Sequence, residues 1–156
     1  MQIDVNPYDM NPYCAMSIDS GKWIIGTPLI AENESRNSYM ISAIIDHTDP
    51  ENGNPLHFSY AQIDPNTLRR NTGYSCYKND CSGYFCEGDI VLYNRKKISQ
   101  NRNIFEIKKK FGSNGFCLRS IYGEIIEEFD ANVAIRCIIL GNIYENDIRD
   151  FIERND

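Results

Sequence analysis

Three cysteines at equal spacing, Cys76, Cys81 and Cys86, are the feature of this sequence that most suggests site chemistry. Zinc takes four tetrahedral ligands, and structural zinc sites usually present cysteines in closely spaced pairs. Here four residues separate successive cysteines, and a fourth ligand would have to come from another cysteine or a histidine. We therefore expect no bound metal or cofactor. The three cysteines remain the only metal candidates, and thiols buried or half-buried in a tyrosine-rich loop are the favoured interpretation.

Nucleophilic catalysis by a cysteine needs a base beside the thiol. His47 and His57 are the two histidines, and Asp46 or Asp49 could orient one of them. Nothing in the sequence brings either histidine to a cysteine. We assign no catalytic residue, and we expect that the protein is not an enzyme.

Carboxylates near two predicted turns have a structural explanation that competes with acid–base or metal chemistry. Asp64 precedes a proline, where it caps a short helical turn, and Glu87 and Asp89 flank Gly88 at the start of an apolar run. Glycine adopts positive φ without strain. We therefore interpret Gly73, Gly88 and Asp89 as structural turn residues.

Charge is strongly segregated along the chain, whose net charge is −6. Residues 95–119 hold eight basic residues and one acidic residue, whereas the segments before and after them are acidic. A basic segment of this kind can bind phosphates, and the nearby aromatic residues Tyr93, Phe105 and Phe111 could stack on bases. The candidate macromolecule-binding residues are Lys96, Lys97, Arg102, Lys108, Lys109 and Lys110.

The same lysines also fit the solvent face of a strand, where they discourage aggregation or pair with the acidic ends of the chain. On this interpretation nucleic acid is a possible partner but not the favoured one. We expect no measurable binding to nucleic acid at about 150 mM salt.

A chain of 156 residues is long enough for one domain with its own core. Its first residues lack the basic and apolar regions of a secretory signal, and no apolar run is long enough to span a membrane. These features predict a cytoplasmic protein with mostly reduced thiols and no membrane partner.

Short runs of β-branched and aromatic residues between turn formers predict a mostly β (β-rich α+β) fold. Residues 1–12 are expected to be irregular, and a hairpin follows around Asp19-Ser20-Gly21. One short helical turn is expected at residues 64–68 and another at 124–129. Residues 145–154 have the spacing of a C-terminal amphipathic helix. The further predicted strands cover residues 38–45, 56–63, 89–93, 103–111, 116–122 and 133–140.

Three pieces of the chain, in order, resemble the YopX-like family of phage and prophage proteins. They are Ile18-Asp19-Ser20-Gly21-Lys22-Trp23-Ile24-Ile25-Gly26; Ile63-Asp64-Pro65-Asn66-Thr67-Leu68 with Thr72-Gly73 and Glu87-Gly88-Asp89-Ile90-Val91; and Ile139-Leu140-Gly141-Asn142-Ile143-Tyr144-Glu145-Asn146. The resemblance spans most of the chain. It implies a single YopX-like domain over residues 1–156 with a small SH3-like barrel, and no catalytic residues. Residues 74–86 depart from the family pattern as an extended cysteine-containing loop.

For function, the resemblance implies a phage or prophage accessory protein in the cytoplasm of a bacterial host cell. We expect a non-enzymatic module that binds another protein or assembles with itself. One alternative is a phage inhibitor of a host defence or nucleic-acid enzyme, with an acidic surface that imitates nucleic acid. Another is a nucleic-acid-binding protein that uses residues 95–119.

Overall fold

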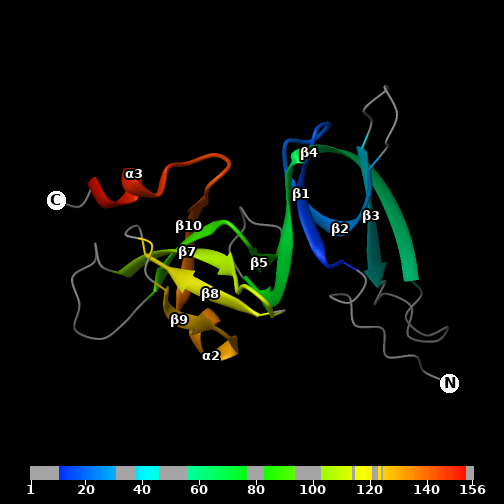
Figure 1. Cartoon of the computed structure of the whole chain (residues 1–156). Helices are drawn as coiled ribbons and strands as arrows, with labels where there is room; N and C mark the ends of the chain where they lie inside the picture. Colours follow the sequence, from blue (N-terminus) through cyan, green and yellow to red (C-terminus); the bar gives the residue numbers. More distant parts are fainter. Residues whose placement is uncertain are drawn as a thin grey trace, which may run out of the picture. The chain divides into compact units, whose positions relative to one another are not determined.

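The computed structural model describes residues 11–30, 38–45, 56–76, 83–93, 103–113, 115–120, 123 and 125–153. Contacts group the chain into two compact units, Met1–Asn71 (unit 1) and Thr72–Asp156 (unit 2), which are described separately below. The predicted mostly β fold is confirmed, because the described residues form two antiparallel sheets and two short helices (Figure 1). A single domain over residues 1–156 stays a prediction.

Unit 1 consists of three strands and most of a fourth, which continues into unit 2. They are β1 (Tyr13–Ser17), β2 (Trp23–Ile30), β3 (Ser38–Ile45) and β4 (Leu56–Ser75). The predicted N-terminal hairpin is confirmed, because β1 and β2 pair antiparallel with Met16 opposite Trp23. Of the segment expected to be irregular, residues 1–10 lie outside the described residues, and residues 11 and 12 precede the first strand.

The strand pairings of unit 1 run in a ring, because β1 pairs with both β2 and β4 while β3 joins β2 to β4. Ile63 of β4 marks the point where β4 changes partner, since it lies opposite Ser38 of β3 and Ser17 of β1. The core is small and consists of Ala15, Met40 and Ile63, each with no exposed surface.

The helical turn predicted at residues 64–68 is wrong, because β4 runs through this segment. The register shifts between Cys14 and Met16, so the residues after Asp64 bulge opposite β1. Side-chain bonds hold the bulge: the Asp64 carboxylate accepts from Asn66 N (3.0 Å), and Thr67 Oγ1 accepts from Met16 N (2.9 Å). The proline that suggested a helix start is therefore accommodated at an irregularity in a strand.

Unit 2 contains the end of β4, six further strands and the two helices. These six strands are β5 (Tyr84–Cys86), β6 (Asp89–Tyr93), β7 (Ile104–Lys109), β8 (Phe116–Arg119), β9 (Ile125–Phe129) and β10 (Cys137–Asn142). The helices are α2 (Ala131–Ala134) and α3 (Ile148–Glu153). The second sheet has the order β10-β6-β7-β8-β9, with all neighbours antiparallel.

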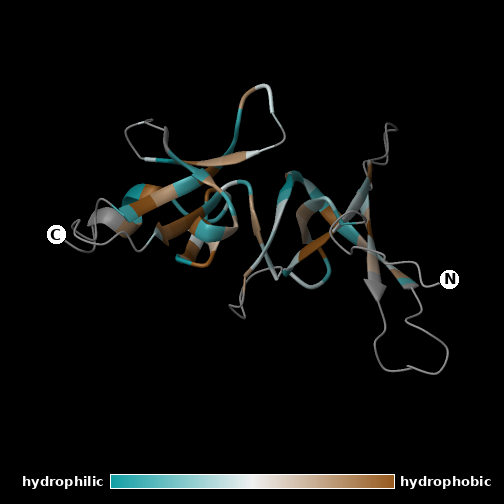
Figure 2. Ribbon diagram, turned by 90° about the horizontal axis from the view of Figure 1, so that it is seen from below, coloured by the Kyte–Doolittle hydropathy of each residue, from teal (hydrophilic) through white to brown (hydrophobic). Residues whose placement is uncertain are grey.

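The core of unit 2 is built largely from one face of this sheet. Its buried residues are Phe85, Val91, Tyr93, Phe105, Ile107, Phe116, Leu118, Phe129, Val133 and Ala134. Tyr74 and Phe85 each meet the ring of Phe129 edge to face, with ring centroids 5.6 Å and 5.4 Å apart respectively. Hydrophobic and hydrophilic residues both occur along the strands (Figure 2), but β6 and β10 are nearly continuous apolar runs.

Several local predictions in unit 2 can be compared with the structure. The short C-terminal helix is confirmed as α3. The helical turn expected at residues 124–129 is wrong, because Ile125–Phe129 form the edge strand β9. The strand expected at 133–140 begins later, as β10, because Asp130 caps the short helix α2 by accepting from Val133 N at 3.0 Å.

Two of the three predicted turn residues behave as expected. Gly88 has a φ of +87°, and Asp89 closes the turn between β5 and β6 by accepting from Cys86 N at 2.8 Å. Gly73 also has positive φ, at +85°, but it lies inside β4 and not in a loop between elements. Gly73 is therefore a residue with left-handed backbone conformation inside a strand, and not part of a turn between elements.

Candidate functional site

The predicted cysteine loop is shorter than residues 74–86, because its two ends are strands. Tyr74 and Ser75 complete β4, and Tyr84–Cys86 form β5. These ends are tied by bonds from Thr72 Oγ1 to Phe85 O (2.6 Å) and from Cys76 N to Gly83 O (2.9 Å). Part of the predicted loop is therefore a β-hairpin that supports the core of unit 2.

The three cysteines proposed as metal candidates do not have a common role. Cys76 is half-buried, is not disulfide-bonded, and packs against the core of unit 2. Cys86 is buried and disulfide-bonded, so its sulfur is not available as a thiolate ligand. Cys81 lies outside the described residues. The described part of the chain contains no group of three or more metal-binding side chains.

The expectation of mostly reduced thiols requires correction at two positions. Cys14 in unit 1 and Cys86 in unit 2 are each disulfide-bonded. Cys76, Cys117 and Cys137 are not disulfide-bonded.

Two free thiols have pKa values that oppose nucleophilic chemistry. Burial, with a smaller contribution from the nearby Glu127 carboxylate, raises the pKa of Cys137 to about 12. Burial also raises the pKa of Cys117, although the cations Lys110, Arg119 and Lys108 oppose this effect. Both thiols are therefore protonated near neutral pH. His57 is exposed on β4 of unit 1, and His47 lies outside the described residues.

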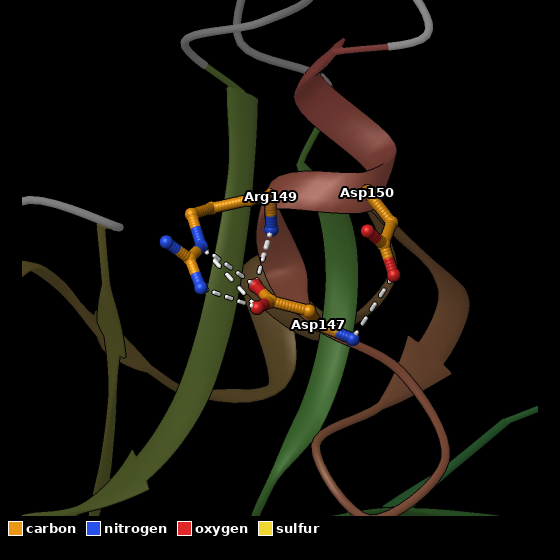
Figure 3. Close-up of polar contacts among 3 residues, drawn as sticks. All are labelled: Asp147, Arg149 and Asp150. Carbon is orange, nitrogen blue, oxygen red and sulfur yellow. Dashed lines mark hydrogen bonds and ion pairs between the residues drawn. The ribbon is translucent and has the colours of Figure 1, made fainter.

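Of the three carboxylates considered for acid–base chemistry, two stabilise local backbone structure, and Glu87 is half-buried beside Gly88. Asp64 and Asp89 accept from backbone N–H groups in the bulge and turn described above. In the C-terminal segment, Asp147 accepts from the backbone and guanidinium of Arg149, and Asp150 accepts from Asp147 N at 3.3 Å (Figure 3). Arg149 lowers the pKa of Asp147 to about 2. This arrangement caps the start of α3, which explains these two carboxylates without catalysis.

The basic candidates divide into two groups. Lys96, Lys97 and Arg102 lie outside the described residues. β7 ends with Lys108 and Lys109, and Lys110 follows it. Asn103 precedes the other end of this strand, which is about 20 Å long because it has six residues.

Part of the charge at this end of β7 is matched by carboxylates. Lys108 Nζ lies 3.7 Å from Glu106 Oε1, and Lys110 Nζ lies 3.4 Å from Glu128 Oε1 on β9. The predicted pairing with the acidic ends of the chain is therefore present at Lys110, because Glu128 lies in the acidic segment after residue 119, whereas Glu106 belongs to the basic segment itself. Lys109 is exposed, and no carboxylate of the described residues forms an ion pair with it.

Of the three aromatic residues proposed to stack on bases, two are in the core. Tyr93 is 5% exposed and Phe105 is 1% exposed, and their rings contact each other with centroids 6.3 Å apart. Both side chains belong to the core of unit 2, so neither ring is available to a ligand. Phe111, in contrast, is fully exposed at the turn between β7 and β8.

An apolar face on the outside of unit 1 was not predicted from the sequence. Its members are Leu29 of β2, Tyr39 of β3, and Phe58 and Tyr60 of β4, with exposed fractions of 51%, 41%, 53% and 70%. We call these four residues the Tyr60 face. The alternation of Phe58 and Tyr60 with smaller residues in β4 was the sequence signal for it.

Strand register places the members of the Tyr60 face beside one another. Leu29 lies opposite Tyr39, Ile41 lies opposite Tyr60, and Ala43 lies opposite Phe58. Side chains two residues apart on a strand point to the same face, so these positions form one surface. The inner side of the ring of strands holds small or flexible residues such as Ala15 and Met40, and the large aromatic residues point outward.

Comparison of the chain with protein-family models, with curated proteins and with solved structures gave no match in any of the three. The resemblance to YopX-like proteins therefore stays a proposal. No helix in the described part of the chain is long and apolar enough to cross a membrane.

Proposed function

We propose that this protein is a non-enzymatic accessory protein of phage or prophage origin that binds another protein through the Tyr60 face. The observation that carries this proposal is the group of four large side chains that lie together on the sheet of unit 1 and remain exposed. A contiguous apolar surface of this kind typically marks an interaction site.

The composition of the face supports a protein partner. Tyrosine residues are enriched at the energetic centres of protein interfaces because they combine a large apolar ring with a hydrogen-bonding hydroxyl. The cross-strand positions between them hold uncharged residues, including Thr27, Ile41 and Gln62. Charged residues are depleted at the centres of interfaces, so this arrangement suits the middle of a contact.

The ring of strand pairings in unit 1 supports a further element of the proposal, a small SH3-like barrel. Such a closed ring would hold β3 and β4 rigidly in register, with Tyr39 and Tyr60 on its outer surface. A pre-organised surface loses little entropy on binding. A specific protein interface involves about 20–30 residues on each side, so the four residues of the Tyr60 face would form only the centre of a contact.

The test is capture of a partner by the tagged full chain in host cells that carry the phage, followed by reconstitution with the purified partner. The matched variants are Phe58→Ser with Tyr60→Ser, and Ile135→Ser in unit 2, which is 81% exposed. We expect the double variant to lose one captured partner and Ile135→Ser to retain it. Light scattering measures self-association of the purified chain.

Three results of this test separate the candidate functions. Equal capture by all variants contradicts the proposal. A dimer that depends on Tyr60 supports the self-assembling module instead. A captured host defence or nucleic-acid enzyme that loses activity on binding supports the inhibitor function.

A further inference from the structure

The turn between β7 and β8 holds an aromatic ring entirely in solvent. Lys110 N donates to Gly115 O (2.9 Å), and Gly115 N donates to Ser113 Oγ (3.1 Å), so the turn has defined internal bonds. Phe111, at the turn, is 106% exposed. Because this ring touches nothing, it contributes no packing to the fold, and it is available to a ligand.

The surroundings of the ring form an open depression of about 500 Å³. Its lining consists of Lys109, Lys110, Phe111, Gly112 and Ser113. Gly112 has a φ of +75°, and a side chain added there would meet no atom within 4 Å, so the space beside Phe111 is open.

The charges beside the ring favour an anion. Lys109 is exposed without an ion pair among the described residues. Lys110 contacts Glu128 at 3.4 Å, with side chains 40% and 63% exposed respectively. An exposed pair of this kind is weak and is exchanged readily for another anion. The turn therefore offers a ring face and two exchangeable ammonium groups within three consecutive residues.

We propose that the β7–β8 turn binds a nucleobase together with its neighbouring phosphate. The base stacks on Phe111, and the phosphate lies between the ammonium groups of Lys109 and Lys110. Stacking on an aromatic ring with cations along the backbone is how single-stranded nucleic acids are bound without sequence preference. A single-stranded nucleic acid and a free nucleotide share this chemistry, and the experiment below distinguishes them.

A flat anionic membrane fits the turn less well than a local strand does. Glu128 lies beside Lys110, and the chain as a whole carries a net charge of −6. A membrane surface would have to meet both Phe111 and this carboxylate, whereas a single base and phosphate need only the ring and the two lysines. This proposal concerns unit 2 alone and does not depend on protein binding by the Tyr60 face in unit 1.

The test uses fluorescence anisotropy of the full chain with a short labelled oligothymidylate at about 20 mM salt, where electrostatic contacts are least screened. An abasic oligomer of the same length has the same phosphates without bases. Phe111→Ala is expected to weaken oligothymidylate binding by about five- to one-hundred-fold and to leave the weaker abasic binding unchanged. Lys109→Gln weakens both.

Two controls keep the result interpretable. Lys22→Gln removes an exposed cation from unit 1, and Ile135→Ala removes an exposed apolar side chain from unit 2. Neither should alter binding of the oligomer. Because Phe111 packs against nothing, its variant should fold normally, which circular dichroism checks. Phe111→Trp should retain binding, with indole fluorescence quenched by the stacked base.

Thymidine monophosphate and anionic vesicles complete the test. If the oligomer binds through Phe111 and the mononucleotide does not, the ligand is a single strand. If both bind with similar affinity, the ligand is a free nucleotide. Equal binding of oligothymidylate by wild type and Phe111→Ala overturns the proposal. Binding that depends on Phe111 only for phosphatidylglycerol vesicles also overturns it, in favour of a membrane.

Discussion

The side-chain amide of Asn11 pairs with both backbone groups of Ala43. Asn11 Oδ1 accepts from Ala43 N at 2.8 Å, and Asn11 Nδ2 donates to Ala43 O at 2.9 Å. Asn11 is 1% exposed and Ala43 is 7% exposed, so water cannot replace these bonds. Asn71 Nδ2 in turn donates to Asn11 O at 3.0 Å. Asn11, two residues before β1, is thereby attached to both β3 and β4.

Replacement of Asn11 should therefore destabilise unit 1. In Asn11→Ala, the N–H and C=O of Ala43 lose their partners while they remain buried. We expect the free energy of unfolding to fall by about 2–4 kcal/mol, measured by urea denaturation. Asn66→Ala, at an exposed position of β4, is the control and should change stability by less than about 0.5 kcal/mol. Similar stability of the two variants would show that the Asn11 bonds do not stabilise the fold.

Gly88 should tolerate no side chain, for two separate reasons. Its φ is +87°, and an added Cβ would lie 3.1 Å from Ile143 Cγ1 and 3.3 Å from Tyr144 Cε2. We expect Gly88→Val to destabilise by about 1–3 kcal/mol through strain and crowding.

Gly83 is a matched control for the Gly88 prediction. Its φ is +91°, but no atom lies within 4 Å of an added Cβ. Gly83→Ala should therefore show only the backbone strain, and Gly88→Ala should be less stable than Gly83→Ala. Equal denaturation midpoints would rule out crowding by Ile143 and Tyr144.

The sequence predicted the fold best where local rules and tertiary packing agree. Asp19-Ser20-Gly21 between two β-favouring runs predicted the β1–β2 hairpin, and Gly21 has the expected positive φ of 66°. Prediction failed in β4, where Pro65 suggested a helix start. There the pairing with β1 stabilises a bulge that local propensity alone does not reveal.

Stability at alkaline pH should depend on Cys137. Its pKa is about 12 in the folded protein, against an ordinary value of 9.0. Between these two pH values the unfolded thiol loses its proton while the folded thiol retains it. The stabilising contribution is therefore fully present below about pH 9 and is lost as pH rises towards 12. Burial also raises the pKa values of Tyr93 and Cys117, as it does that of Cys137.

Chemical denaturation from neutral to alkaline pH measures this effect. For wild type we expect the free energy of unfolding to decline above about pH 9, by up to about 1 kcal/mol per pH unit from Cys137. Cys137→Ala removes this part of the slope. Ile139→Val, at another residue packed against the same core, should lower stability without altering the slope. An unchanged slope in Cys137→Ala would contradict the assignment.

The candidate sites were harder to predict than the fold, because charge and composition do not specify which side chains are exposed. The sequence grouped Tyr93, Phe105 and Phe111 as stacking residues, but the first two alternate into the core and only Phe111 faces solvent. In the same way, the outward direction of Phe58 and Tyr60 depends on the ring of strands in unit 1. Both outcomes follow from strand register, which involves partners distant in the sequence.

Glu128 should limit the affinity of the β7–β8 turn for anions. Its carboxylate lies 3.4 Å from Lys110 Nζ and competes with a phosphate for that cation. Glu128→Gln should therefore strengthen oligothymidylate binding severalfold at low salt. Because the pair is exposed, stability should change by less than about 0.5 kcal/mol. Glu127→Gln on the same strand, which forms no ion pair with Lys110, is the control and should bind as wild type does.

The salt dependence provides an independent check of this arrangement. One phosphate of a single strand held between Lys109 and Lys110 gives a slope of about −0.7 in log affinity against log salt. Affinity should then fall by roughly fourfold between about 20 and 150 mM salt. A much steeper slope would mean that further cations take part, and a flat one would mean that Lys109 and Lys110 contact no phosphate.

A Glu128→Gln variant that binds oligothymidylate no better than wild type would show that Lys110 is not the cation that contacts the phosphate.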